Sequence, residues 1–142
     1  MNRYCLPPSQ LARPRRILVA DDDEPLRRML GQCLEDEGYQ VHLAANGKLA
    51  LEAMSSFLPD LIVLDVTMPE LDGIEVARRV RDVGDTPILM ISGLAHEIDR
   101  RAGLSAGATD YMIKPMRLCD LLTRVEQLLP ATEANDEAST GT

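Results

Sequence analysis

The sequence has few of the residues that bind zinc or form covalent cross-links. Its three cysteines, Cys5, Cys33 and Cys119, are widely spaced and odd in number, and no C-x-x-C motif occurs. Its only histidines are His42 and His96. Neither a zinc site nor a disulfide framework is therefore predicted. Cys33 falls on the apolar stripe of an expected helix, where we expect it to pack as a small hydrophobic residue.

Long hydrophobic runs and an excess of basic charge are also missing. No window contains the roughly 18 consecutive apolar residues that a membrane-spanning helix needs. The basic N-terminal segment has no apolar core of signal-peptide length. A net charge of −8 argues against nucleic-acid binding by this chain alone. We therefore expect a cytoplasmic protein without a membrane domain.

The apolar residues alternate between two kinds of segment. Five short runs rich in β-branched or aliphatic residues are typical of strands, and they occur at 16–20, 39–44, 61–65, 87–92 and 109–113. The run at 61–65 suits a strand buried on both faces. Helical spacing lies between and after them, most clearly over 26–34 and 118–129. Asn46 suits a helix cap. The pattern predicts an α/β fold, a doubly wound (βα)5 parallel sheet of flavodoxin type with strand order 2-1-3-4-5.

The two ends of the chain differ from this pattern. Residues 1–14 carry three prolines, and residues 131–142 carry three acids and no apolar periodicity. We therefore predict a flexible N-terminal extension over 1–14, one domain over 15–130, and a disordered acidic tail over 131–142. Such a tail cannot fold into an effector domain, so we expect either a stand-alone domain or a piece of a longer chain.

Polar residues follow the strands at one edge of the predicted sheet. Because ligands of such sheets bind outside the carboxyl ends of the strands, these residues form the candidate site. They are Asp21, Asp22, Asp23, Asp65, Ser92 and Lys114. Taken singly, each has a simpler interpretation: an aspartate before a helix is most often a cap, which is our prediction for Asp23. Together they deliver complementary groups from four strand ends.

Several carboxylates beside one lysine suit a hard cation such as Mg²⁺ and the transfer of a phosphoryl group to a carboxylate. Asp65, on the central strand of the group, is the predicted nucleophile. Asp22 would hold the metal, and Asp21 would assist through water. Ser92 would donate a hydrogen bond to the phosphoryl group, and Lys114 would pair with it.

These residues resemble the receiver (CheY-like) domain of two-component response regulators, over about 15–129. The matching motifs are ILVADDDEPLRRML, PDLIVLDVTMPELDGIEVARRVR, TPILMISG and GLSAGATDYMIKP. The resemblance implies that Asp65 is the phosphoacceptor and that the backbone carbonyl of Thr67 joins the Mg²⁺ ligands. It further implies a cis Lys114–Pro115 bond and a switch residue at Tyr111 that responds to Ser92. The partner would be a sensor histidine kinase or a histidine phosphotransfer protein.

The sequence departs from the family pattern at two positions. Ser92 stands where threonine is common and keeps the hydroxyl. Met116 stands where phenylalanine is usual, so packing near the switch surface is expected to differ. Neither departure removes a group that phosphoryl transfer needs.

A finer resemblance, to receivers of OmpR/PhoB-type winged-helix regulators, concerns output. It implies a phosphorylation-dependent homodimer through the fourth helix, fifth strand and fifth helix. Its charge pairs between subunits would be Arg100 with Asp120 and Asp110 with Arg124. The alternative is that Asp120 and Arg124, four residues apart, simply pair on their own helix.

Two other functions are alternatives to a signalling module. The motif Asp65-x-Thr67 also resembles the nucleophile motif of haloacid-dehalogenase-like phosphatases, which would make the protein an enzyme. That family places its metal-binding acids after the lysine, whereas Asp21 and Asp22 precede Lys114. A flavin-binding, flavodoxin-like protein needs a phosphate-cradling loop after the first strand, and three consecutive aspartates there have the wrong charge.

Overall fold

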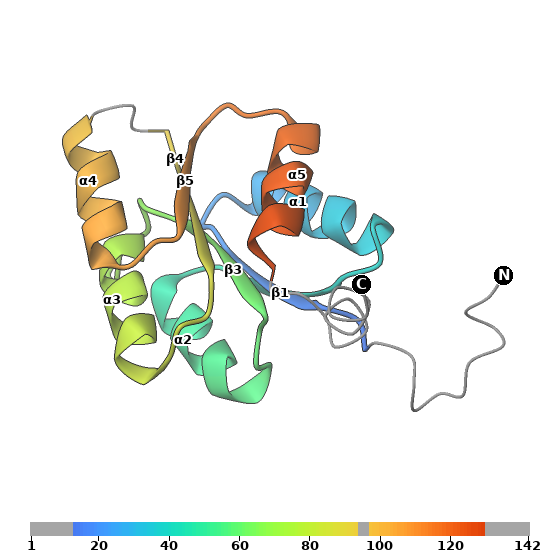
Figure 1. Cartoon of the computed structure of the whole chain (residues 1–142), viewed down its shortest axis with the longest axis horizontal. Coiled ribbons are helices and arrows are strands. Elements are labelled where there is room, and N and C mark those ends of the chain that lie inside the picture. Colours follow the sequence, from blue (N-terminus) through green and yellow to red (C-terminus); the bar gives the residue numbers. More distant parts are fainter. Residues whose placement is uncertain (1–12, 94–96, 130–142) are drawn as a thin grey trace, which may run out of the picture.

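The protein is built on one sheet of five parallel strands in the order β2-β1-β3-β4-β5 (Figure 1). The structure, a computed structural model, describes residues 13–93 and 97–129. The strands are β1 (Arg16–Ala20), β2 (Gln40–Ala44), β3 (Leu61–Asp65), β4 (Ile88–Ser92) and β5 (Asp110–Ile113). The predicted fold class and strand order are confirmed.

Helices cover both faces of the sheet. They are α1 (Glu24–Asp36), α2 (Gly47–Ser56), α3 (Gly73–Val83), α4 (Glu97–Ala106) and α5 (Leu118–Leu128). The helices α1 and α5 lie on one face, and α2, α3 and α4 lie on the other (Figure 1). Each helix follows a strand, and α1 to α4 return the chain to the start of the next strand, as crossovers between parallel strands require.

Two apolar cores lie on the two faces of the sheet. In β3, Leu61 and Val63 pack toward α1 and α5, while Ile62 and Leu64 pack toward the other three helices. Successive strand residues point to opposite faces, so a strand covered on both sides must be apolar at every position. This is why β3 is a continuous hydrophobic run, and why Asp65 at its end is out of place in a core.

Side chains cap two of the helices as the sequence predicts. The Asp23 carboxylate accepts a hydrogen bond from the Leu26 N–H at the start of α1. The Asn46 side chain accepts one from the Leu49 N–H at the start of α2. Each cap satisfies a donor that the first turn leaves without a partner. Cys33 is half-buried on α1.

The predicted terminal segments lie mostly outside the described residues, as do Cys5 and His96, so their boundaries stay predictions. Arg13 is described, and its guanidinium forms an ion pair with Asp60, with 2.9 Å between Nη2 and Oδ1. Asp60 also accepts a hydrogen bond of 2.8 Å from the Arg16 N–H. The start of β1 is therefore tied to the loop before β3.

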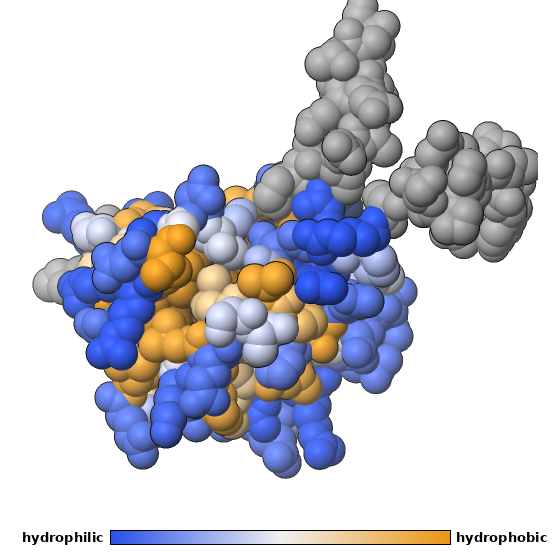
Figure 2. Space-filling view, turned by 90° about the horizontal axis from the view of Figure 1, so that it is seen from below, coloured by the Kyte–Doolittle hydropathy of each residue, from blue (hydrophilic) through white to orange (hydrophobic). Residues whose placement is uncertain are grey.

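The outer surface includes apolar as well as charged residues. Seen from below, the molecule shows hydrophobic residues in the middle of the face and hydrophilic residues around them (Figure 2). Exposed large hydrophobic residues include Leu49 on α2 and Leu58 just after it. Over the described ranges, none of the helices combines the length and the apolar content needed to cross a membrane.

Candidate functional site

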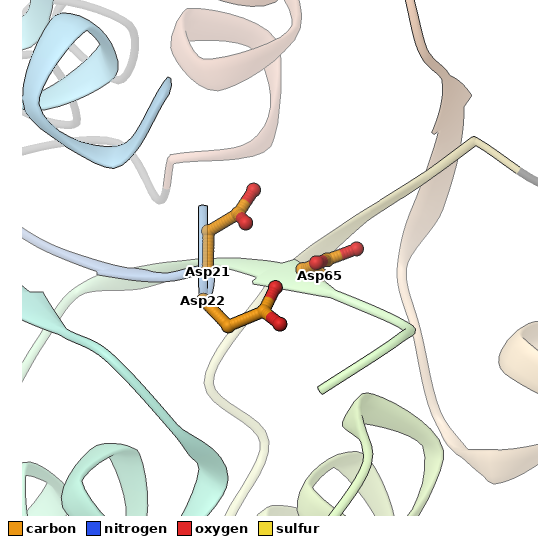
Figure 3. A group of neighbouring side chains, drawn as sticks. All are labelled: Asp21, Asp22 and Asp65. Atoms are coloured by element: carbon orange, nitrogen blue, oxygen red, sulfur yellow. The ribbon is translucent and has the colours of Figure 1, made fainter. Parts of the chain in front are cut away.

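Three carboxylates converge where β1 and β3 end side by side. Asp21 and Asp22 directly follow β1, and Asp65 is the last residue of β3. One carboxylate oxygen from each lies within 4.8 Å of the others (Figure 3). Asp21 and Asp65 are buried, whereas Asp22 is exposed. The sequence predicted this cluster, and its oxygen donors have the chemistry that Mg²⁺ prefers.

Lys114, which follows β5, reaches across the sheet edge to two of these carboxylates. Its Nζ lies 3.0 Å from Oδ2 of Asp21 and 3.5 Å from Oδ1 of Asp65. The bond between Lys114 and Pro115 is cis, as the resemblance implied. The lysine offsets part of the negative charge that the buried acids would otherwise hold unpaired.

Backbone donors fix the two buried carboxylates further. The Asp23 N–H donates to Oδ1 of Asp21 at 2.9 Å, and the Thr67 N–H donates to Oδ1 of Asp65 at 3.4 Å. The side chain of Asp22 makes no hydrogen bond or ion pair with any residue that the structure describes. Its direction therefore depends on the backbone that carries it.

The site perturbs the acidity of its own groups. Burial and the negative charge of Asp21 raise the pKa of Asp65 to about 7, although Lys114 and the Thr67 N–H act in the opposite direction. Burial alone would lower the pKa of Lys114, but its hydrogen bond to Asp21 and the charges of Asp65 and Asp21 raise it overall. Without a further cation the site thus favours a proton on Asp65 at moderately acidic pH.

Ser92 and Tyr111 occupy the neighbouring strands. Ser92 is the fully buried last residue of β4, and Tyr111 is a buried residue of β5. Tyr111 packs against α4, where a Cβ placed on Gly103 would lie 3.3 Å from its ring. Ser92 therefore lies at the carboxyl end of its strand, whereas Tyr111 lies opposite Met90, two residues before the end of β5, and is buried in the protein.

The predicted dimer residues lie on α4, β5 and α5. Arg100 is exposed on α4 and Asp120 is exposed in the first turn of α5. Asp110 and Arg124 pair with each other in the same chain, with 2.6 Å between Oδ2 and Nη1. The alternative pair, Asp120 with Arg124, is absent from the ion pairs of the described residues.

Sequence reasoning missed one contact of the site. Arg27, in the first turns of α1, donates a 2.9 Å hydrogen bond from Nη1 to the backbone carbonyl of Asp21. A signal was present: a cation near the N-terminus of a helix opposes the helix dipole, so an arginine there suggests a specific acceptor nearby.

Known proteins share both the sequence and the fold. The family model of the response regulator receiver domain matches residues 17–126. The response regulator MprA of Mycolicibacterium vanbaalenii is 48% identical over 126 residues, which are 88% of this chain and 54% of that protein. MprA of Mycobacterium avium is 48% identical over 124 residues, 87% of this chain and 54% of the relative. The chain thus spans about half the length of these curated relatives.

Solved structures of receiver proteins have a similar fold. The chemotaxis protein CheY4 of Vibrio cholerae superposes with a TM-score of 0.78 at 32% identity, over 82% of this chain and 100% of that one. The BeF3-activated N-terminal receiver domain of RstA from Klebsiella pneumoniae gives a TM-score of 0.79 at 26% identity, over 82% of this chain and 100% of that one.

Proposed function

Because the chain belongs to the response regulator receiver domain family of two-component systems, we propose that Asp65 accepts a phosphoryl group from a sensor histidine kinase or a histidine phosphotransfer protein. In this step the bond between phosphorus and a histidine nitrogen breaks, and a bond between phosphorus and a carboxylate oxygen of Asp65 forms. The observation that carries the proposal is the position of Asp65 at the end of a buried strand, 3.5 Å from Lys114 and beside two further carboxylates.

The acidic cluster is the proposed Mg²⁺ site. Asp22, Asp65 and the backbone carbonyl of Thr67 would hold the ion, and Asp21 would assist through water. The fit rests on three carboxylates with oxygens within 4.8 Å of one another, one of them exposed to the solvent from which the ion would enter. When bound, Mg²⁺ neutralises charge on the transferring group and favours the ionised form of the carboxylates.

Lys114 and Ser92 complete the proposed phosphoryl site. The ammonium of Lys114 already lies between Asp21 and Asp65, so it can pair with a phosphoryl oxygen after small movements. The hydroxyl of Ser92 comes from the next strand along the sheet and would donate a hydrogen bond to the phosphoryl group. Movement of Ser92 would then be sensed by Tyr111 on β5.

We propose that output occurs through the surface of α4, β5 and α5, by dimerisation or by binding of a partner. The relatives named MprA support a regulatory role, and the RstA receiver shows that a domain of this fold can be studied in a BeF3-activated state. The proposed domain comprises residues 15–130, of which the family model matches 17–126.

The family assigns the chain to signalling rather than to conventional catalysis. No observation favours the phosphatase alternative. Acids that precede the lysine in the chain, and a receiver match that extends past Lys114, both fit a phosphoacceptor domain. The only reactions expected of the chain are its own phosphorylation and dephosphorylation.

The test is labelling by acetyl phosphate in the presence of Mg²⁺, with intact mass measured by mass spectrometry. One phosphoryl group per wild-type chain is expected, removable by hydroxylamine as an acyl phosphate should be. Asp65→Asn should remain unlabelled. Asp23→Asn is the matched control, because asparagine keeps the helix cap and removes an adjacent acid; it should label normally. Stoichiometric label on Asp65→Asn, or none on wild type, would refute the assignment.

A further inference from the structure

Asp22 is the exposed member of the acidic cluster, and its side chain is not held by other side chains. Asp21 is held by Lys114 and by the Asp23 N–H, and Asp65 by Lys114 and the Thr67 N–H. Asp22 has no comparable partner among the described residues. The carboxylate most open to an incoming cation therefore takes its direction from its backbone (Figure 3).

Two contacts hold the backbone on either side of Asp22. The peptide that follows Asp22 donates its N–H, that of Asp23, to Oδ1 of Asp21 at 2.9 Å. The peptide that precedes Asp22 carries the carbonyl of Asp21, which accepts the 2.9 Å hydrogen bond from Nη1 of Arg27. Because a peptide unit is planar, fixing this carbonyl fixes the plane from which Asp22 projects.

The position of Arg27 is not explained by contact with solvent or by stabilisation of its own helix. Its side chain is only 13% exposed, and it lies near the N-terminus of α1, where the helix dipole disfavours a cation. Its second contact, Nη2 to Oε2 of Glu24, is 3.7 Å long and involves a carboxylate that is 64% exposed. A pair of that kind contributes little. The carbonyl of Asp21 is the contact that accounts for the position of the guanidinium.

We infer that Arg27 is a positioning residue for Mg²⁺ binding: by holding the Asp21–Asp22 peptide, it directs the Asp22 carboxylate toward Asp65. The inference rests on the proposed function, since it concerns the same metal site. It makes a prediction opposite in sign to simple electrostatics. Removing a cation beside three acids should strengthen cation binding through charge alone, whereas losing a positioning contact should weaken it.

The experiment is calorimetric titration of the full chain with Mg²⁺ alone, at pH 8. For Arg27→Gln we expect a dissociation constant about tenfold above wild type, the size of effect seen when residues that orient metal ligands are changed. Arg27→Lys keeps the charge and a hydrogen-bond donor, so its dissociation constant should lie between those of wild type and Arg27→Gln. Arg28→Gln is the matched control: it removes the same charge from the next, exposed residue and should bind Mg²⁺ as wild type or more tightly.

Thermal unfolding in metal-free buffer distinguishes a general loss of stability in Arg27→Gln from a specific effect on Mg²⁺ binding. If Arg27→Gln lowers the melting temperature but leaves the Mg²⁺ constant at or below the wild-type value, the inference is wrong. If Arg27→Gln does not fold, Arg27→Lys decides: weaker binding supports the inference, and wild-type binding overturns it. A wild-type chain that binds no Mg²⁺ would overturn both this inference and the proposed metal site. If wild type binds Mg²⁺ and Arg27→Gln has the same dissociation constant, this inference alone is overturned.

Discussion

Arg124 of α5 donates a hydrogen bond to Asp110 of β5 within one chain, with 2.6 Å between Nη1 and Oδ2. Sequence resemblance implied that these two residues pair between the subunits of an activated dimer. In the single chain they already satisfy each other. A dimer that uses the same groups would have to break this ion pair and form new ones between the subunits.

The first prediction concerns this pair. Arg124→Gln should change the free energy of unfolding by less than about 1 kcal/mol, because both partners are more than a third exposed. If the surface of α4, β5 and α5 forms the dimer, the variant should stay monomeric with Mg²⁺ and beryllofluoride while wild type dimerises. Light scattering gives the molar mass.

Arg78→Gln on α3, where the native side chain is 60% exposed, is the control and should dimerise as wild type does. A dimer of Arg124→Gln as stable as that of wild type would move the interface elsewhere. A wild-type monomer with beryllofluoride bound would point to partner binding as the output.

The second prediction concerns pH. The pKa of Asp65 is raised to about 7, compared with about 3.9 in an unfolded chain. Between these values the folded protein binds more protons than the unfolded one, so the free energy of unfolding should fall as pH rises from about 4 to about 7 and then level off. The decrease is on the order of 1 kcal/mol or more.

Asp65→Asn removes this titration and should therefore be more stable than wild type at pH 8 without Mg²⁺, with the difference shrinking toward pH 4. Urea denaturation at four or five pH values measures it. Equal stability of the two proteins across the whole range would show that the buried acid is not perturbed.

The third prediction concerns the close approach of α4 to the sheet. A Cβ on Gly103 would lie 2.6 Å from Sδ of Met90 and 3.3 Å from the ring of Tyr111. Gly103→Ala should lower the free energy of unfolding by about 1 kcal/mol, because crowding outweighs the better helix propensity of alanine. It should also displace the Tyr111 ring, which nuclear magnetic resonance of the ring protons would detect.

Gly84→Ala is the paired control, since a Cβ there meets nothing within 4 Å and the backbone is extended. It should be neutral or slightly stabilising. Unshifted Tyr111 signals in Gly103→Ala would mean that Met90 alone yields to the added methyl group.

The fourth prediction concerns the opposite end of the sheet. Burial would raise the pKa of Asp60, but the hydrogen bonds from Arg13 and from the Arg16 N–H, together with nearby arginine charge, lower it overall. A lowered pKa means that the carboxylate stabilises the fold above about pH 4 and that this contribution is lost as pH falls. Asp60→Asn should lower the free energy of unfolding by about 1 kcal/mol at pH 7 and by less at pH 3.5, as measured by urea denaturation. Asp82→Asn, at an exposed position on α3, should cost nothing at either pH.

The sequence predicted what depends on periodicity and order. Continuous apolar runs identified β3 and β4 because both faces of these strands are covered. The alternation of strands and helices indicated the parallel sheet, and right-handed crossovers place helices on both of its faces. The sequence also predicted which residues lie close together in the site, because the carboxyl ends of parallel strands meet at one edge of the sheet. These residues are Asp21, Asp22, Asp65 and Lys114. The pattern marked these residues because each closely follows an apolar run.

The missed contacts depend on long side chains that reach backbone groups. Arg27 finds the carbonyl of Asp21, and Arg81 of α3 donates to the carbonyls of Gly107 and Thr86. Spacing along a helix says nothing about a carbonyl in another segment. The sequence paired Arg124 with Asp110 between subunits or with Asp120 on its own helix, because both acids are plausible by charge; packing places Asp110 beside Arg124 within one chain.

The contact between Lys114 and Asp21 joins residues 93 positions apart in the chain. During synthesis, β1 and its acids emerge long before the lysine that neutralises them, and β3 must be placed between the two. The site is thus completed only after β5 and Lys114 have been synthesised. A chain interrupted before β5 would expose clustered acids without their counter-ion, so the contact between Lys114 and Asp21 forms only when the whole sheet has been assembled.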